Sequence, residues 1–97
     1  MKTKITEIQI IPIKPKEGLV AFASFILDGK LYLGSIGIMT RPQGGYRLVY
    51  PTKKVAEKNL NIFYPINREF ASTIENEVVR QFENVMKKYD RHNSFNS

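Results

Sequence analysis

The sequence contains no cysteine and a single histidine, His92. Without cysteine the chain has no disulfides and no thiolate ligands, which is compatible with a reducing compartment. With one histidine, neither a Cys/His pair nor a multi-histidine zinc site can be assembled. Glu75 and Glu77 are two positions apart in an expected helix, so their carboxylates point to different faces and do not form an acid/base pair. These absences predict a protein that is not an enzyme and uses no metal, cofactor or small-molecule substrate.

Long apolar runs are also missing. No segment approaches the length needed to span a bilayer, and the N-terminal residues MKTKITEIQI lack the apolar core of a signal peptide. We therefore expect a cytoplasmic protein that does not engage a membrane. The length of 97 residues suits one small domain over residues 1–90. Residues 91–97 show no periodicity and are expected to form a disordered tail.

The first half of the chain consists of apolar segments separated by turn signals. The first segment, residues 5–13, contains Pro12, which cannot donate to a β-ladder, so we place it at a sheet edge or break it near Pro12. Further strands are expected at residues 19–27, 30–40 and 46–50, with turns at 14–18, 28–29 and 41–45. Every connection is too short for a parallel crossover. The pattern predicts an antiparallel meander of four to five strands.

The segment 19–27, LVAFASFIL, is apolar on both of its faces. One helix can cover only one face of a sheet, so we expect a second subunit to cover the other. Asp28-Gly29 is a hairpin signal for a two-residue type I′ turn, because Asp tolerates and Gly prefers a positive φ. Gly34 and Gly37 interrupt the next strand and indicate a bulge or a close backbone approach.

After residues 64–67, YPIN, the apolar period changes to that of a helix. An apolar stripe spaced by three or four residues predicts an amphipathic helix of about twenty residues; its members are Phe70, Ile74, Val78, Phe82, Val85 and Tyr89. Asn67 is a candidate N-cap, and Ser72 with Glu75 is a competing capping box that would start the helix later. Together with the meander, this helix predicts an α+β fold.

The positive charge is unevenly distributed. Residues 1–67 hold ten basic and four acidic residues, whereas residues 68–97 hold five of each, so the whole net charge of +6 belongs to the expected sheet and its loops. Within residues 41–58, five basic residues are opposed only by Glu57; they are Arg41, Arg47, Lys53, Lys54 and Lys58. This region would attract a polyanion more readily than the helix would.

Rings and cations alternate over residues 46–54, a mixture that proteins use for stacking and phosphate contacts on single-stranded nucleic acids. The alternative is that Tyr46 and Tyr50 pack in the sheet while the lysines are solvated. The segment between the two Tyr-Pro pairs at 50–51 and 64–65 is therefore either a binding site or a solvated connection between sheet and helix.

The order of these features resembles the stage V sporulation protein G family (SpoVG, the septation regulators) over about residues 4–86. TEIQII at 6–11 resembles the T-D-V-R-L/I opening of its first strand, and LVAFASFILDGKLYL at 19–33 resembles its K-A-I-A-S-I-T-L-D-x-x-F-V-V segment. YPTKK at 50–54 resembles its M-P-S-K-R motif, and YPIN at 64–67 resembles H-P-I-N. The resemblance implies a small bacterial, cytoplasmic, dimeric, non-enzymatic protein. Family members bind DNA, and some RNA, and influence cell division, sporulation and gene expression.

The chain departs from the family pattern at two places. Ser35 and Gly37 stand where the family carries an acidic and a basic residue, and 71–73, Ala-Ser-Thr, replace a basic cluster at the helix start. We therefore expect the nucleic-acid contacts on the loop and sheet surface rather than on the helix. Lys53 and Lys54 match the basic pair of the motif and would contact phosphates, supported by Arg41, Arg47, Lys58 and Arg68. A protein-interaction adaptor in division control is the alternative function.

Overall fold

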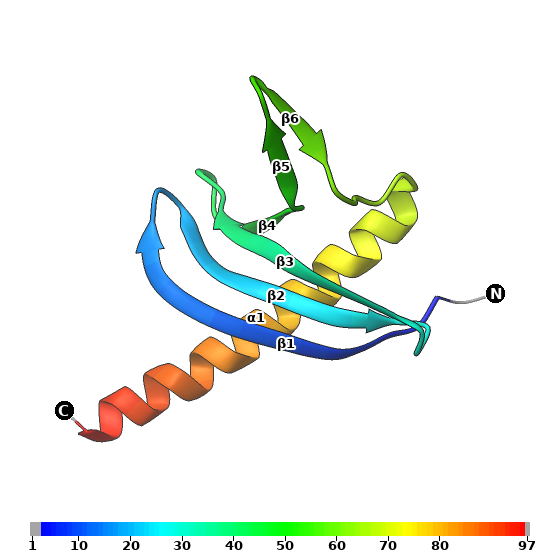
Figure 1. The fold of residues 1–97 in the computed structure, drawn as a ribbon. Helices are drawn as coiled ribbons and strands as arrows, with labels where there is room; N and C mark the ends of the chain where they lie inside the picture. The colour runs from blue at the N-terminus through cyan, green and yellow to red at the C-terminus, as the bar shows by residue number, and fades with distance from the viewer. Residues whose placement is uncertain (1–2, 97) are drawn as a thin grey trace.

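The computed structural model describes residues 3–96, and side chains as far as Lys88. The elements in chain order are β1 (Ile5–Lys16), β2 (Leu19–Leu27), β3 (Leu31–Thr40), β4 (Tyr46–Val49), β5 (Thr52–Val55), β6 (Lys58–Asn61) and α1 (Arg68–Asn96). The first four strands form one antiparallel sheet in the order β1-β2-β3-β4, and β5 pairs only with β6 (Figure 1). The expected α+β fold with an antiparallel meander is confirmed. No helix within residues 3–96 is long and apolar enough to cross a membrane.

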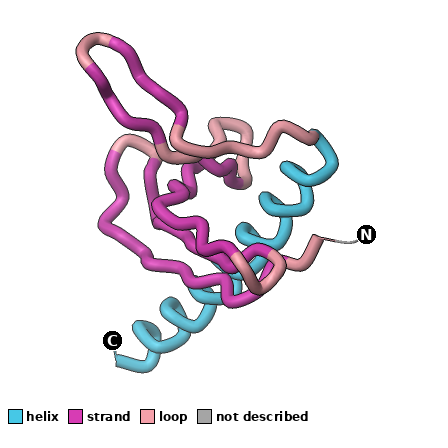
Figure 2. The backbone as a smooth tube through the Cα atoms, turned by 45° about the vertical axis from the view of Figure 1, so that its right-hand side comes forward, coloured by secondary structure: helices cyan, strands magenta, loops and turns pink. Residues whose placement is uncertain are grey.

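Helix α1 lies across one face of the four-stranded sheet (Figure 2). The core forms between the helix and the sheet. The buried core residues come from β2, β3 and α1; they are Ala21, Ala23, Phe25, Ile36, Ile38, Ile74, Val78 and Phe82. The last three belong to the apolar stripe that the sequence predicted. Burial of a large apolar side chain contributes about 1.5–3 kcal/mol, so this stripe accounts for the docking of the helix.

The N-terminus of α1 is capped by Asn67. Its Oδ1 accepts a hydrogen bond of 2.7 Å from the backbone N–H of Phe70, as the predicted N-cap requires. The competing start at Ser72 is wrong, because the helix begins at Arg68. At 29 residues α1 is longer than the predicted twenty. The structure describes α1 as far as Asn96 and leaves Ser97 outside the described residues, and the disordered tail expected at residues 91–97 stays a prediction.

The Asp28-Gly29 turn has positive φ at both positions, 53° and 65°, as predicted. The backbone N–H of Lys30 donates to the carbonyl of Leu27 at 2.9 Å, but the strand pairing closes at Leu27 and Leu31, so the loop has three residues rather than two. The predicted turn at 14–18 is too long. Strand β1 continues to Lys16, and residues 17 and 18 alone make the turn, both with positive φ.

The predicted bulge in the third strand lies at residues 34–35 of β3. Between the pairs Ala23–Ile36 and Phe25–Leu33, two residues of β3 oppose one of β2, and Ser35 has a φ of 59°. The expected edge position of the first strand is also confirmed, because β1 borders only β2. Its pairing with β2 is irregular at two places, between Thr6 and Gln9 and again between Pro12 and Lys16.

The β5–β6 hairpin was not predicted as a separate element. Figure 1 shows it standing away from the four-stranded sheet, at the end of the molecule where α1 begins. A two-residue turn joins its strands, and Ala56 in that turn has a φ of 56°. The segment that the sequence left as either site or connection is therefore a projecting β-ribbon.

Candidate nucleic-acid interface

The β5–β6 hairpin carries three of the six predicted contact residues: Lys53, Lys54 and Lys58. Every residue of both strands is exposed. An isolated two-stranded hairpin is marginally stable in water, so its stability depends on contacts with the rest of the domain. At its base the N–H of Ile62 donates to the carbonyl of Pro51 at 3.1 Å, and the ring of Tyr50 packs edge-on against Phe63 with centroids 5.9 Å apart. The hairpin is thus held at its base and free along its length.

The two faces of the hairpin differ in chemistry. Residues paired across strands share a face, and successive residues in a strand alternate. One face, here called the amide face, combines the pairs Thr52–Asn61 and Lys54–Asn59. The other, the lysine–apolar face, combines Lys53–Leu60 and Val55–Lys58. Lys53 and Lys54, which are adjacent in the sequence, therefore point to opposite sides.

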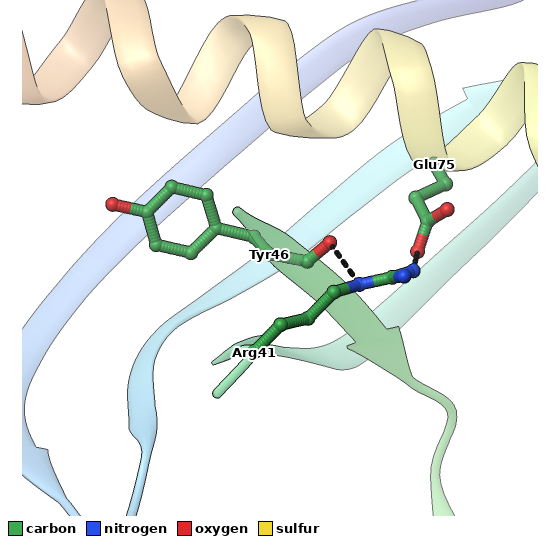
Figure 3. A network of polar contacts seen from close by, with 3 residues as sticks. All are labelled: Arg41, Tyr46 and Glu75. Carbon is green, nitrogen blue, oxygen red and sulfur yellow. Dashed lines mark hydrogen bonds and ion pairs between the residues drawn. The ribbon is translucent and has the colours of Figure 1, made fainter. Parts of the chain in front are cut away.

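Arg41 is engaged within the fold. Its Nη2 lies 3.1 Å from Oε1 of Glu75 on α1, and its Nε donates to the backbone carbonyl of Tyr46 at 3.0 Å (Figure 3). The ion pair holds the β3–β4 turn against the helix, and the hydrogen bond to Tyr46 closes the turn itself. A phosphate contact by Arg41 would have to compete with the Glu75 carboxylate.

Arg47 and Arg68 lie on elements outside the β5–β6 hairpin. Arg47 in β4 pairs with Met39, and its Nη2 lies 3.8 Å from the Met39 sulfur, on the sheet face opposite α1. Arg68 is the exposed first residue of α1, separated from β6 by residues 62–67. Of the six predicted residues, the structure brings the three lysines together on one ribbon and leaves the arginines on three other elements.

The tyrosines of the ring-and-cation segment pack in the fold instead of presenting stacking surfaces. Tyr46 lies edge-on to Phe82 with centroids 4.9 Å apart, and Tyr50 contacts Phe63. Burial raises the pKa of Tyr50 to about 12, and the nearby Glu75 carboxylate adds to the rise. Both rings therefore pack within the fold, as the alternative expected, although only Tyr46 belongs to a strand of the sheet.

Asn59 and Asn61 were missed as candidate residues. Their signal is the alternation of Lys58, Asn59, Leu60 and Asn61, which places both amides on one side of a strand. Both residues are uncharged and lie outside the recognised motifs, so the sequence alone did not indicate them. Within the described residues, no cluster of three or more metal-ligating side chains is present.

The architecture defines a small α+β domain in which one capped helix covers an antiparallel meander and a basic ribbon projects from its end. In a comparison with protein families, the SpoVG family model matches residues 3–84. The chain belongs to the SpoVG family, which supports a role related to sporulation and septation. The comparison with curated proteins gives no match.

Proposed function

We propose that the protein is a cytoplasmic, homodimeric, non-enzymatic regulator that binds nucleic acid through the β5–β6 hairpin and thereby influences septation, sporulation and gene expression. The observation that carries this proposal is the projecting hairpin with three exposed lysines and one acidic residue, Glu57. Neither ion pair among the described residues uses a hairpin lysine. These cations can neutralise phosphates without first giving up an internal partner.

The uncovered face of the sheet supports the dimer. Opposite α1, the pairs Ile11–Phe22 and Gly37–Val49 form an apolar surface, here called the outer sheet face. Phe22 is 37% exposed although it lies in a central strand, and a groove of about 480 Å³ runs beside it. A second copy covering this face would bury it and would bring two hairpins into one complex, so that the number of phosphate contacts doubles.

One observation favours a second function, that of a protein-interaction adaptor. Val55 and Leu60, on the lysine–apolar face, are 47% and 50% exposed. Exposed apolar side chains on a projecting strand suit a protein partner better than a phosphate backbone. The adaptor function predicts no appreciable affinity for nucleic acid.

A mobility-shift panel with duplex DNA, single-stranded DNA and RNA at fixed low salt separates the two functions. A salt titration then compares the wild type with Lys53→Ala/Lys54→Ala on the same oligonucleotide. Removing one phosphate contact should flatten the slope of log affinity against log salt by about 0.9 on duplex DNA or about 0.7 on single strands. Lys30→Ala, which alters an exposed lysine in a different hairpin, is the matched control and should leave the slope unchanged.

Thermal melts check that each variant folds, which we expect because exposed lysines contribute little to stability. Absence of binding to all three nucleic acids by the wild type would contradict the proposal and favour the adaptor. A salt slope that is unchanged by the double substitution would instead remove Lys53 and Lys54 from the phosphate-binding surface.

A further inference from the structure

The amide face of the β5–β6 hairpin has a composition that phosphate binding does not require. Its four residues are Thr52, Lys54, Asn59 and Asn61, all exposed. No hydrogen bond among the described residues uses the side-chain amide of either asparagine. Two free amides, a lysine and a threonine thus share one side of the two strands, and none of these four paired residues is acidic or large and apolar.

These side chains match the chemistry of base edges in the major groove. Asparagine can form paired hydrogen bonds with N6 and N7 of adenine, lysine can donate to O6 and N7 of guanine, and the threonine methyl can contact the methyl of thymine. The major groove of B-form DNA, about 12 Å wide, admits a two-stranded β-ribbon.

The spacing of the amide face also fits a duplex. Its two cross-strand pairs, Lys54–Asn59 and Thr52–Asn61, are two residues apart along the ribbon. Two residues of a strand span about 6.8 Å. Stacked nucleotides of a B-form strand repeat about every 3.4 Å, so the two pairs lie about two base steps apart.

We propose that the amide face reads base edges in the major groove of double-stranded DNA. This inference rests on the proposed function, and it assigns a separate task to each face. The lysine–apolar face then points away from the bases, and it carries Lys53 on one strand and Lys58 on the other. Each lysine can reach back to the phosphates that flank the groove. Contacts to phosphates position the protein, whereas contacts to bases specify the sequence.

The same geometry favours duplex DNA over the other nucleic acids. The major groove of A-form RNA is deep and narrow, and side chains cannot read it. Single strands are bound chiefly through stacking on aromatic rings, and neither β5 nor β6 contains an aromatic residue. The ribbon therefore has the means to read a duplex but not to stack unpaired bases.

The test begins with selection of a preferred duplex by the wild type from a randomised library. Affinity for this duplex and for a scrambled one is then measured for Asn59→Ala/Asn61→Ala, with Lys53→Ala/Lys58→Ala as the matched pair from the opposite face. The amide variant should bind the preferred duplex roughly 5- to 150-fold more weakly for each bidentate contact removed, and the scrambled duplex almost as well as the wild type does. The lysine variant should weaken on both duplexes and show a flatter salt slope.

A chemical change in the DNA gives a second readout. Replacing adenines of the preferred site by 7-deazaadenine removes the N7 acceptor from the major groove and leaves base pairing intact. The substitution should weaken binding of the wild type but not of the amide variant. Thermal melts of both variants confirm folding.

Three outcomes would overturn this inference while leaving nucleic-acid binding in place: no sequence preference in the wild type, equal weakening of the amide variant on both duplexes, or binding to single strands or RNA alone. Absence of binding to any nucleic acid would overturn the proposed function together with the inference.

Discussion

Arg41 and Glu75, 34 positions apart in the sequence, form an ion pair with Nη2 and Oε1 3.1 Å apart that joins the β3–β4 turn to α1. Glu75 also lies close enough to Tyr50 to contribute to the raised pKa of that phenol. A single carboxylate of the helix therefore influences both ends of β4, the strand that leads into the projecting hairpin.

Replacing Arg41 with alanine should lower the free energy of unfolding by only about 0.2–1 kcal/mol, because the paired side chains are 47% and 32% exposed and solvent screens their attraction. A double-mutant cycle with Glu75→Gln in chemical denaturation measures this coupling. Arg41→Ala should also change the salt slope of nucleic-acid binding less than Lys53→Ala does, since Arg41 already has a partner. An equal or larger change would assign Arg41 to the binding surface.

Tyr50 should make the fold sensitive to alkaline pH. Its pKa is about 12 in the folded protein, above the value of about 10 for an unfolded chain. The folded state therefore holds the phenolic proton more tightly, and this contribution to stability is complete below pH 10 and is lost as pH rises towards 12. Tyr50→Phe should reduce the fall in unfolding midpoint over that range. Ultraviolet titration of the wild type should show a tyrosine that ionises near pH 12, and this step should be missing from the variant.

The Asp28-Gly29 turn should tolerate only residues that accept a positive φ. A side chain at Gly29 would meet no atom within 4 Å, so its φ of 65° is the main constraint. Gly29→Val should lower the free energy of unfolding by about 1 kcal/mol or more, because a β-branched residue resists this conformation. Gly29→Asn is the control and should lower the free energy of unfolding by less, because asparagine tolerates a positive φ. Equal denaturation midpoints for the two variants would contradict the assignment of strain to the backbone.

The outer sheet face should mediate self-association. Light scattering of the wild type at micromolar concentration should give the mass of a dimer. Phe22→Glu should reduce the measured mass to that of a monomer, because the substitution places a charge in the apolar surface that a second copy would bury. Val55→Glu alters an exposed apolar residue on the hairpin instead and should leave the mass unchanged. A monomeric wild type would argue against the dimer directly.

The elements that the sequence predicted are those whose signals are local. The span of β2 from Leu19 to Leu27 follows from an apolar run that ends at Asp-Gly, and the positive φ at residues 28 and 29 follows from the turn chemistry. Asn67 as N-cap and the stripe of Ile74, Val78 and Phe82 follow from helical spacing. Each signal depends on neighbours a few positions away, so no tertiary information was needed.

The β5–β6 hairpin escaped prediction because its local signals are weak. TKKV and KNLN have little apolar alternation, and the turn between them uses Ala56, with a φ of 56°, where Gly or Asn would have been recognised. Cross-strand pairing alone decides which side chains share a face. This pairing places Lys53 and Lys54 on opposite faces of the hairpin, and Lys54 and Asn59 on the same face.

By itself, the sequence determined the α+β class, the capped amphipathic helix, the order of the meander strands and the concentration of positive charge before residue 68, because periodicity, turn chemistry and composition are properties of the chain. Only the tertiary structure decided which charges are engaged and which are free. Arg41 meets Glu75 on a distant helix, and Tyr50 packs at the base of the hairpin, whereas the hairpin lysines project into solvent. These differences arise from contacts between residues far apart in the chain, which no local pattern records.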